Sequence, residues 1–303
     1  RLLLVVAVLV LVALVATGVG VLTGGGVLTG GDGDAPSAQP TPTDSPDPTP
    51  TVATASYDVY LAVGDSLAAG YQPANPGDRT DREGGYAGAV RAGLAGNGQA
   101  PDLVNLGCPG ETTATLVAGG TCTYAEGGQL AAVEAALASA PDSGARTLVT
   151  VQVGANDVQR CVRLDGEAPA VDDACVAAGL ESVRTLLPEA LQRIRRAAPQ
   201  ARVVVLDYYN PFAVAALLGP ALEPLAARSE QVQAELNELI TSVAHEAGAD
   251  VTDVATAFSG GDAASVGPIC SLTWMCGDPP DVHATTAGYE LMAAQVLGAL
   301  RGS

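Results

Sequence analysis

The sequence of 303 residues contains no lysine, only two histidines and only one tryptophan. All 14 basic residues are arginines, and they stand against 33 acidic residues, which gives a formal net charge of −19. A charge of this sign argues against nucleic acids and anionic membrane surfaces as partners, because both would be repelled. We interpret the acidity as a source of solubility rather than as a site for a cationic partner.

Three further patterns are absent or scarce. The sequence has no Gly-x-Ser-x-Gly, so the nucleophile turn of α/β-hydrolases is not available. It has no Cys-x-x-Cys and no histidine next to a cysteine, so the cysteines do not indicate a metal site. Aromatic residues make up 4% of the chain, which disfavours the aromatic platform of a binding module.

The chain opens with an uncharged apolar run, Leu2–Leu22, preceded by Arg1. At about 1.5 Å per residue, a helix of this length would cross a bilayer core about 30 Å thick. We expect residues 1–22 to be a signal peptide or an uncleaved membrane anchor rather than a buried core helix. No cysteine directly follows the run, so lipid attachment is not expected.

Residues 23–55 are rich in glycine and then in proline, threonine, serine and aspartate. Frequent proline removes backbone donors, so this segment is predicted to be a disordered linker. An apolar segment followed by such a linker places the remainder, residues 56–303, outside the membrane. We therefore expect an exported domain, extracellular or tethered at the cell surface, with membrane contact only through the N-terminal segment.

The six cysteines agree with an exported location. Six cysteines allow 15 pairings, but their spacing favours three local disulfides. The expected pairs are Cys108 with Cys122, Cys161 with Cys175, and Cys270 with Cys276. Each of the two longer loops would stabilise the fold by about 3 kcal/mol in the chain-entropy model.

Strand-like and helix-like segments alternate from Tyr57 onward. The predicted strands are Tyr57–Val63, Asp102–Asn105, Arg146–Val153, Arg202–Asp207 and Asp250–Asp253. The predicted helices are Tyr86–Leu94, Gly128–Ser139, Leu180–Ala198, Ser229–Ala247 and Thr286–Leu300. Solidly apolar strands such as Val203–Leu206 are typical of a sheet covered on both faces. We predict one α/β domain, a three-layer α/β/α sandwich with a central parallel sheet.

Groups suited to acyl transfer follow several of these strands, at the edge where open α/β sheets place their active sites. Ser66 comes just after the first strand; taken alone, it is better explained as an ordinary helix N-cap, because serine is favoured there. If a helix begins near Ser66, its N–H groups would face the site. Gly107 and Asn156 offer a backbone N–H and an amide, although each also suits an ordinary turn.

The two histidines leave few choices for a general base. His245 falls late in a predicted helix, where a solvated histidine is favourable. His283 follows a proline-containing loop and precedes the last predicted helix, which suits a base better. Asp281 lies two residues earlier and would orient the imidazole, unless it is simply a solvated loop acid.

Four short blocks, in order along the chain, resemble the SGNH/GDSL hydrolases. They are Gly64-Asp65-Ser66-Leu67, Asn105-Leu106-Gly107, Gly154-Ala155-Asn156-Asp157 and Asp281-Val282-His283. The resemblance covers roughly residues 57–300 and implies a flavodoxin-like sandwich. It implies Ser66 as nucleophile and His283 as base. It also implies an oxyanion hole made by the N–H groups of Ser66 and Gly107 and the Asn156 side chain.

One position departs from the family pattern. The acid often stands three residues before the histidine, and here that residue is Pro280. The resemblance leaves two possibilities for orienting His283: Asp281 or a main-chain carbonyl. The local cysteine pairs are similar to those of the secreted bacterial esterase/lipase branch.

The resemblance implies a serine esterase or lipase that hydrolyses carboxylic esters through an acyl-enzyme. We expect small-molecule or lipid esters as substrates, no metal or organic cofactor, and a monomer. The alternatives are an O-acetyl esterase acting on cell-wall or plant polysaccharides and a non-catalytic wall-binding module. Pocket walls are expected from the loops Gln72–Gly84 and Arg160–Asp173.

Overall fold

The computed structural model describes residues 56–75, 77–96, 100–139, 145–163, 169–260 and 267–301. They belong to one compact unit of the chain. The predicted N-terminal segment 1–22 and linker 23–55 lie outside the described residues. Within the described ranges, no helix combines the length and apolar character needed to cross a bilayer.

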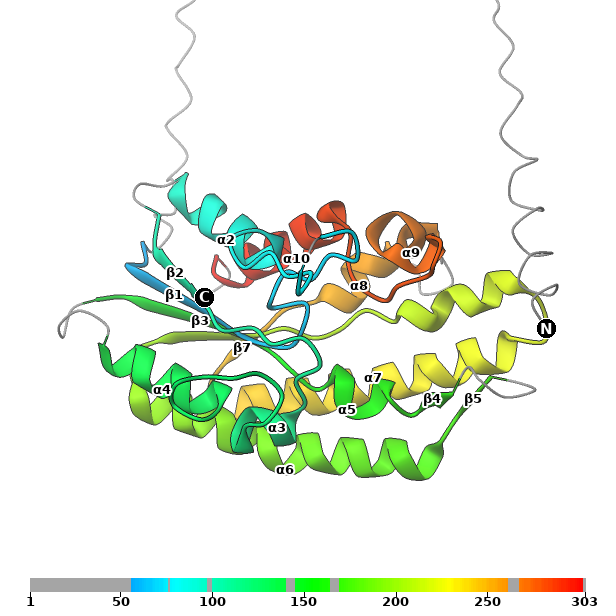
Figure 1. Cartoon of the computed structure of the whole chain (residues 1–303), viewed down its shortest axis with the longest axis horizontal. Coiled ribbons are helices and arrows are strands. Elements are labelled where there is room, and N and C mark those ends of the chain that lie inside the picture. The colour runs from blue at the N-terminus through cyan, green and yellow to red at the C-terminus, as the bar shows by residue number, and fades with distance from the viewer. Residues whose placement is uncertain are drawn as a thin grey trace, which may run out of the picture. The chain divides into compact units, whose positions relative to one another are not determined.

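Five parallel strands form the central sheet (Figure 1). In chain order they are β1 (Val59–Gly64), β2 (Asp102–Asn105), β3 (Thr147–Gln152), β6 (Arg202–Val205) and β7 (Asp250–Val251). Their spatial order is β2-β1-β3-β6-β7. All residues of β1 and β3 are buried, because helices cover both faces of the sheet. The predicted three-layer fold is therefore confirmed.

Helices form a layer on each side of the sheet (Figure 1). One layer contains α2 (Gly85–Ala95), α8 (Val254–Ser259), α9 (Gly267–Leu272) and α10 (Thr286–Ala299). The other contains α3 (Thr113–Ala118), α4 (Gln129–Ser139), α5 (Ala155–Gln159), α6 (Asp173–Ala197) and α7 (Glu223–Glu246). From β1 the chain first adds β2 on one side of the sheet and then adds β3, β6 and β7 on the other side. This reversal opens a crevice at the carboxyl ends of β1 and β3, where doubly wound folds bind ligands.

Two long helices begin earlier than predicted. Helix α6 starts at Asp173 rather than Leu180, because the Asp172 side chain caps it by accepting from the Cys175 N–H at 3.1 Å. Helix α7 starts at Glu223 rather than Ser229, with a proline in its first turn, where proline is tolerated.

Several short elements were not predicted. The 3₁₀ helix η2 (Pro211–Leu218) follows β6, and η3 (Trp274–Cys276) follows α9. The strands β4 (Val162–Arg163) and β5 (Ala170–Val171) pair as an antiparallel ribbon. Elements this short carry too few residues for a periodic hydrophobic pattern.

Candidate active site

The chain passes unusually close to β3 just before Ser66. Gly64 ends β1 with φ +132°, and a Cβ at this position would lie 1.9 Å from the Gln152 carbonyl oxygen. The next residue, Asp65, donates its N–H to that same carbonyl at 2.9 Å. Only glycine permits this approach, so Gly64 sets the direction in which the chain enters the Ser66 turn.

Ser66 lies in a single tight turn, and no helix begins there. The Ala69 N–H bonds the Asp65 carbonyl at 3.0 Å, but Gly70 then adopts φ +66° and ends the turn. The left-handed conformation of Gly70 stops the helical path after one turn. Ser66 therefore presents its side chain from a turn rather than from a helix N-terminus.

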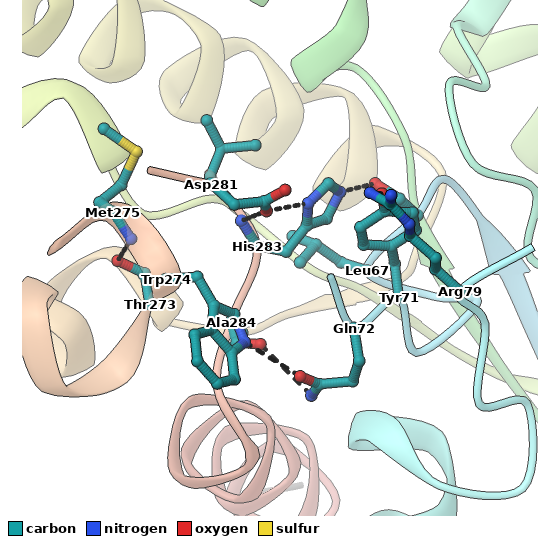
Figure 2. A network of polar contacts seen from close by, with 12 residues as sticks. Leu67, Tyr71, Gln72, Arg79, Thr273, Trp274, Met275, Asp281, His283 and Ala284 are labelled. Carbon is teal, nitrogen blue, oxygen red and sulfur yellow. Dashed lines mark hydrogen bonds and ion pairs between the residues drawn. The ribbon is translucent and has the colours of Figure 1, made fainter. Parts of the chain in front are cut away.

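The structure brings together Ser66, His283 and Asp281. Ser66 Oγ lies 2.8 Å from Nε2 of His283, a residue 217 positions further along the chain. On the other side of the ring, Nδ1 lies 2.5 Å from Asp281 Oδ1, which also accepts the His283 backbone N–H at 2.9 Å. Figure 2 shows Asp281 and His283 in line. The group facing Nδ1 is thus a carboxylate rather than a main-chain carbonyl.

A backbone clip holds the loop that carries His283. The Trp274 N–H donates to the His283 carbonyl at 2.9 Å, and the Asp281 N–H donates to the Trp274 carbonyl at 3.1 Å. Thr273 and Ala284 form an antiparallel bridge across the same loop. These bonds tie both ends of the His283 loop to one residue, Trp274, so the imidazole has a defined position.

Tyr71 and Gln72 complete this side of the site, and the sequence did not single them out. The Tyr71 ring lies against the His283 imidazole, with ring centroids 4.1 Å apart. Gln72 accepts from the Trp274 indole N–H at 3.0 Å and donates to the Ala284 carbonyl at 3.4 Å (Figure 2). The loop after Ser66 is thereby bonded to the loop around His283.

Two carboxyl groups near Ser66 have opposite pKa shifts. Burial raises the pKa of Asp281, but hydrogen bonds from the ring and backbone of His283 outweigh it and leave the pKa below its usual value. Burial raises the pKa of Asp65 to about 6, despite hydrogen bonds from Tyr208 and the Leu67 N–H. Tyr208 donates to Asp65 Oδ2 at 2.6 Å. The site thus combines a readily ionised acid beside His283 with a buried acid beside the serine.

The two donors predicted from other strands, Asn156 and Gly107, both lie near Ser66 but have different hydrogen-bond partners. Asn156 lines the same pocket as Ser66, and its amide donates to the Glu111 carbonyl at 3.0 Å. Gly107 packs against the Ser66 turn, where a Cβ would lie 2.3 Å from the Ala69 nitrogen. The Gly107 N–H donates to Asn105 Oδ1 at 2.9 Å, the geometry of an Asx turn. The alternative explanation by turn chemistry therefore describes the Gly107 N–H in this structure.

An apolar pocket opens beside Ser66, Asn156 and His283. Its apolar lining includes Val158, Val162, Val171, Phe212, Val232 and Leu236. The predicted wall from Arg160–Asp173 is present through the β4–β5 ribbon. None of the described residues of the other predicted loop, Gln72–Gly84, lines this pocket. Residues of η2 and α7 line it instead, among them Phe212, Val232 and Leu236.

All three predicted disulfides are present. Cys108 pairs with Cys122, Cys161 with Cys175, and Cys270 with Cys276. The second pair closes the base of the β4–β5 ribbon, and the third encloses Trp274 beside the His283 loop. The other histidine, His245, is exposed in the last turn of α7.

A family model described as the GDSL-like Lipase/Acylhydrolase family matches residues 62–291. The chain belongs to this family. The match confirms the resemblance seen in the four sequence blocks, and membership supports an ester hydrolase activity. A search of curated proteins finds no match to the chain.

Solved structures share the fold of this GDSL-like chain. An extracellular lipase from Streptomyces rimosus has a TM-score of 0.54 and 22% identity, covering 79% of this chain and 98% of its own. A phospholipase A1 from Streptomyces albidoflavus has a TM-score of 0.52 and 23% identity, and the match covers 81% of this chain and 98% of that protein. An acetyl xylan esterase from Geobacillus stearothermophilus has a TM-score of 0.51 and 19% identity, and the match covers 81% of this chain and 95% of that protein. At these identities the likeness establishes the fold.

Proposed function

We propose that this GDSL-like protein is a serine esterase that hydrolyses carboxylic esters through an acyl-enzyme intermediate. One observation carries the proposal: the unbroken line from Ser66 Oγ through the His283 ring to the Asp281 carboxylate, at 2.8 and 2.5 Å. Nucleophile, base and orienting acid within hydrogen-bond distance form the arrangement that acyl transfer requires.

In this mechanism Ser66 Oγ attacks the ester carbonyl carbon while His283 Nε2 takes the hydroxyl proton. The Asp281 carboxylate holds the ring through Nδ1 and stabilises the imidazolium that forms. His283 then gives the proton to the leaving alcohol. Water repeats the sequence in the second half of the reaction, releasing the acid and restoring Ser66.

The negative oxygen of the tetrahedral intermediate needs preorganised donors. We assign this role to the N–H groups of Ser66 and Gly107 and to the Asn156 amide. Asn156 has a second N–H besides the one bonded to the Glu111 carbonyl. Gly107 would have to share its N–H with Asn105 or release it when substrate binds. Loss of one such donor typically costs about 10²–10³ in turnover.

The apolar pocket supports an acyl group longer than acetyl. Aliphatic side chains from α5, β4, β5 and α7 line it directly beside Ser66. Each methylene of a bound chain would gain about 0.8 kcal/mol by leaving water. Acetate would leave this space unused, so we expect medium-chain esters to be hydrolysed more efficiently than acetylated polysaccharides.

We further propose that the enzyme is exported and acts as a monomer outside the cell. Three disulfides within the folded part support an oxidising location. The apolar segment 1–22 would serve as signal peptide or tether, followed by the linker 23–55. The activity would then reside in residues 56–303.

The deciding experiment replaces the nucleophile. Ser66→Ala should abolish hydrolysis of p-nitrophenyl esters from acetate to palmitate, while circular dichroism and melting temperature stay close to wild type. A fluorophosphonate probe should label Ser66 and no other serine. Activity that survives the substitution would overturn the proposal. Acetylated xylan belongs in the same panel, because one structural neighbour is an acetyl xylan esterase; faster release of acetate from xylan than of octanoate would favour that alternative substrate.

A further inference from the structure

A cation lies beside the aromatic ring that covers His283. Arg79 Nη1 donates to the Tyr71 phenol oxygen at 3.2 Å, and the Tyr71 ring packs against the imidazole with the two planes tilted by 32°. In Figure 2, Asp281 lies at one end of the His283 ring, and Tyr71 and Arg79 lie toward the other. The guanidinium therefore lies beside the aromatic ring that contacts the imidazole.

The backbone holds Arg79 in an uncommon conformation. Its φ is +62°, and no other described residue except glycine has a positive φ. A long side chain is disfavoured there, whereas glycine adopts this conformation freely. The Arg79 carbonyl accepts the Gln72 N–H at 2.7 Å. This bond holds the backbone of Arg79 next to the segment that carries Tyr71. A guanidinium thus occupies a position where the backbone alone would favour glycine.

The guanidinium has hydrogen-bonding capacity to spare. Its bond to Tyr71 uses one of five N–H donors, and the side chain is exposed. Within the described part of the chain, no carboxylate forms an ion pair with Arg79. Its charge contributes to the low pKa of Asp281, so it acts electrostatically on the site.

Arg79 lies away from the pocket assigned to the acyl group. The residues that line that pocket include neither Tyr71 nor Arg79. In acyl transfer the base gives its proton to the leaving oxygen, so the alcohol portion of the ester lies next to His283 Nε2. A substituent on the alcohol portion can then extend past Tyr71 toward Arg79.

We propose that Arg79 forms an anion subsite for the alcohol portion of the substrate, and that the preferred esters carry a carboxylate or phosphate group there. This inference rests on the proposed serine esterase function. A protein of net charge −19 repels an anionic substrate at long range. A guanidinium at the site offsets that repulsion locally, because it bonds carboxylate and phosphate oxygens with two parallel N–H groups.

The test compares two octanoyl esters that differ in one charge: the ester of a hydroxynitrobenzoic acid and the ester of its uncharged carboxamide. In the full chain, Arg79→Gln should lower kcat/KM for the anionic ester about tenfold, through KM. The loss for the uncharged ester should be smaller, so the ratio of the two kcat/KM values should fall. Arg79→Lys should retain part of the preference for the anionic ester, and 1 M salt should reduce it in the wild type.

A matched control removes a positive charge elsewhere. Arg184 lies on α6 and pairs with Glu181 on the same helix. Arg184→Gln should leave the ratio of the two kcat/KM values unchanged. Arg79→Gly separates the backbone from the charge: it should fold at least as stably as wild type and still lose the preference for the anionic ester.

Equal losses for both octanoyl esters in Arg79→Gln, or no loss for either, would overturn the subsite. A second pair, dihexanoyl phosphatidylglycerol and dihexanoylglycerol as dissolved monomers, distinguishes phosphate from carboxylate. A response confined to one anion assigns the subsite to that anion, and a response to neither overturns it. Failure of the esterase proposal has a different signature, since Ser66→Ala would then remain active on the uncharged ester.

Discussion

The side-chain amide of Gln129 hydrogen-bonds both the N–H and the carbonyl of Gly64, at 3.0 and 2.8 Å. Gln129 is fully buried at the first position of α4, and its NH₂ also donates to the Leu106 carbonyl at 2.8 Å. One amide therefore joins the strand end before Ser66 to the strand end before Gly107. This makes Gln129 a positioning residue for two of the three proposed oxyanion donors.

The first prediction concerns that amide. Gln129→Glu keeps the shape of the side chain, but an ionised carboxylate cannot donate to the carbonyls of Gly64 and Leu106. We expect kcat for p-nitrophenyl octanoate to fall by about tenfold or more, with KM nearly unchanged, because the donors matter most in the transition state. Gln231→Glu, on the exposed face of α7, is the control and should be silent. A rise in KM alone would contradict the positioning role.

The second prediction separates the two histidines and the acid. His283→Ala should reduce turnover to near background, whereas His245→Ala should be nearly normal, because His245 is exposed at the end of α7. Asp281→Asn removes the charge that stabilises the imidazolium and should lower kcat by about 10⁴, as in other serine triads. Steady-state kinetics with p-nitrophenyl octanoate measures all three. Near-full activity in Asp281→Asn would indicate a dyad of Ser66 and His283.

The third prediction is a pH dependence of stability. Burial raises the pKa of Asp65 from 3.8 to about 6. Between these values the unfolded chain has lost the proton and the folded protein retains it, so the stability present at pH 4 is lost as the pH rises through 6. Relative to Asp65→Asn, the wild-type free energy of unfolding should fall by roughly 2 kcal/mol between pH 4 and 7.

Urea denaturation of both proteins across this range measures the difference. Asp78 supplies a control of opposite sign, because hydrogen bonds from Thr80 lower its pKa. Relative to Asp78→Asn, the wild type should gain stability as the pH rises through the acidic range. If the difference in free energy of unfolding between wild type and Asp65→Asn stays constant with pH, Asp65 is not held in its protonated form.

The fourth prediction concerns acyl chain length. Val171 lies on β5 in the pocket wall and is only partly buried, so a larger side chain there can turn into the pocket. Val171→Phe should lower kcat/KM for octanoate about tenfold and leave acetate within twofold. The p-nitrophenyl series measures kcat/KM for octanoate and for acetate with the same variant. A loss on acetate would indicate that the substitution damages the catalytic site itself. Equal losses along the series would place the acyl chain elsewhere.

The residues that the sequence indicated as nucleophile and base also adjoin in the structure. With two histidines in the chain and one of them late in an amphipathic helix, His283 could be selected by elimination. Ser66 follows a fully apolar strand, and the carboxyl ends of parallel strands meet at one edge of a sheet. Tyr71 and Gln129 carried no comparable signal, because a tyrosine in a loop and a glutamine at a helix start are common.

The alternation of strands and helices, the parallel sheet and the local disulfides could all be predicted from the sequence. These depend on apolar runs and short spacings, which are local properties of the chain. Three features became visible only in the folded protein: Asp281 faces His283 Nδ1, the Gly107 N–H is bonded to Asn105, and η2 and α7 line the pocket. Such contacts depend on loop paths and on where helices begin, and distant packing sets these more than local propensity does.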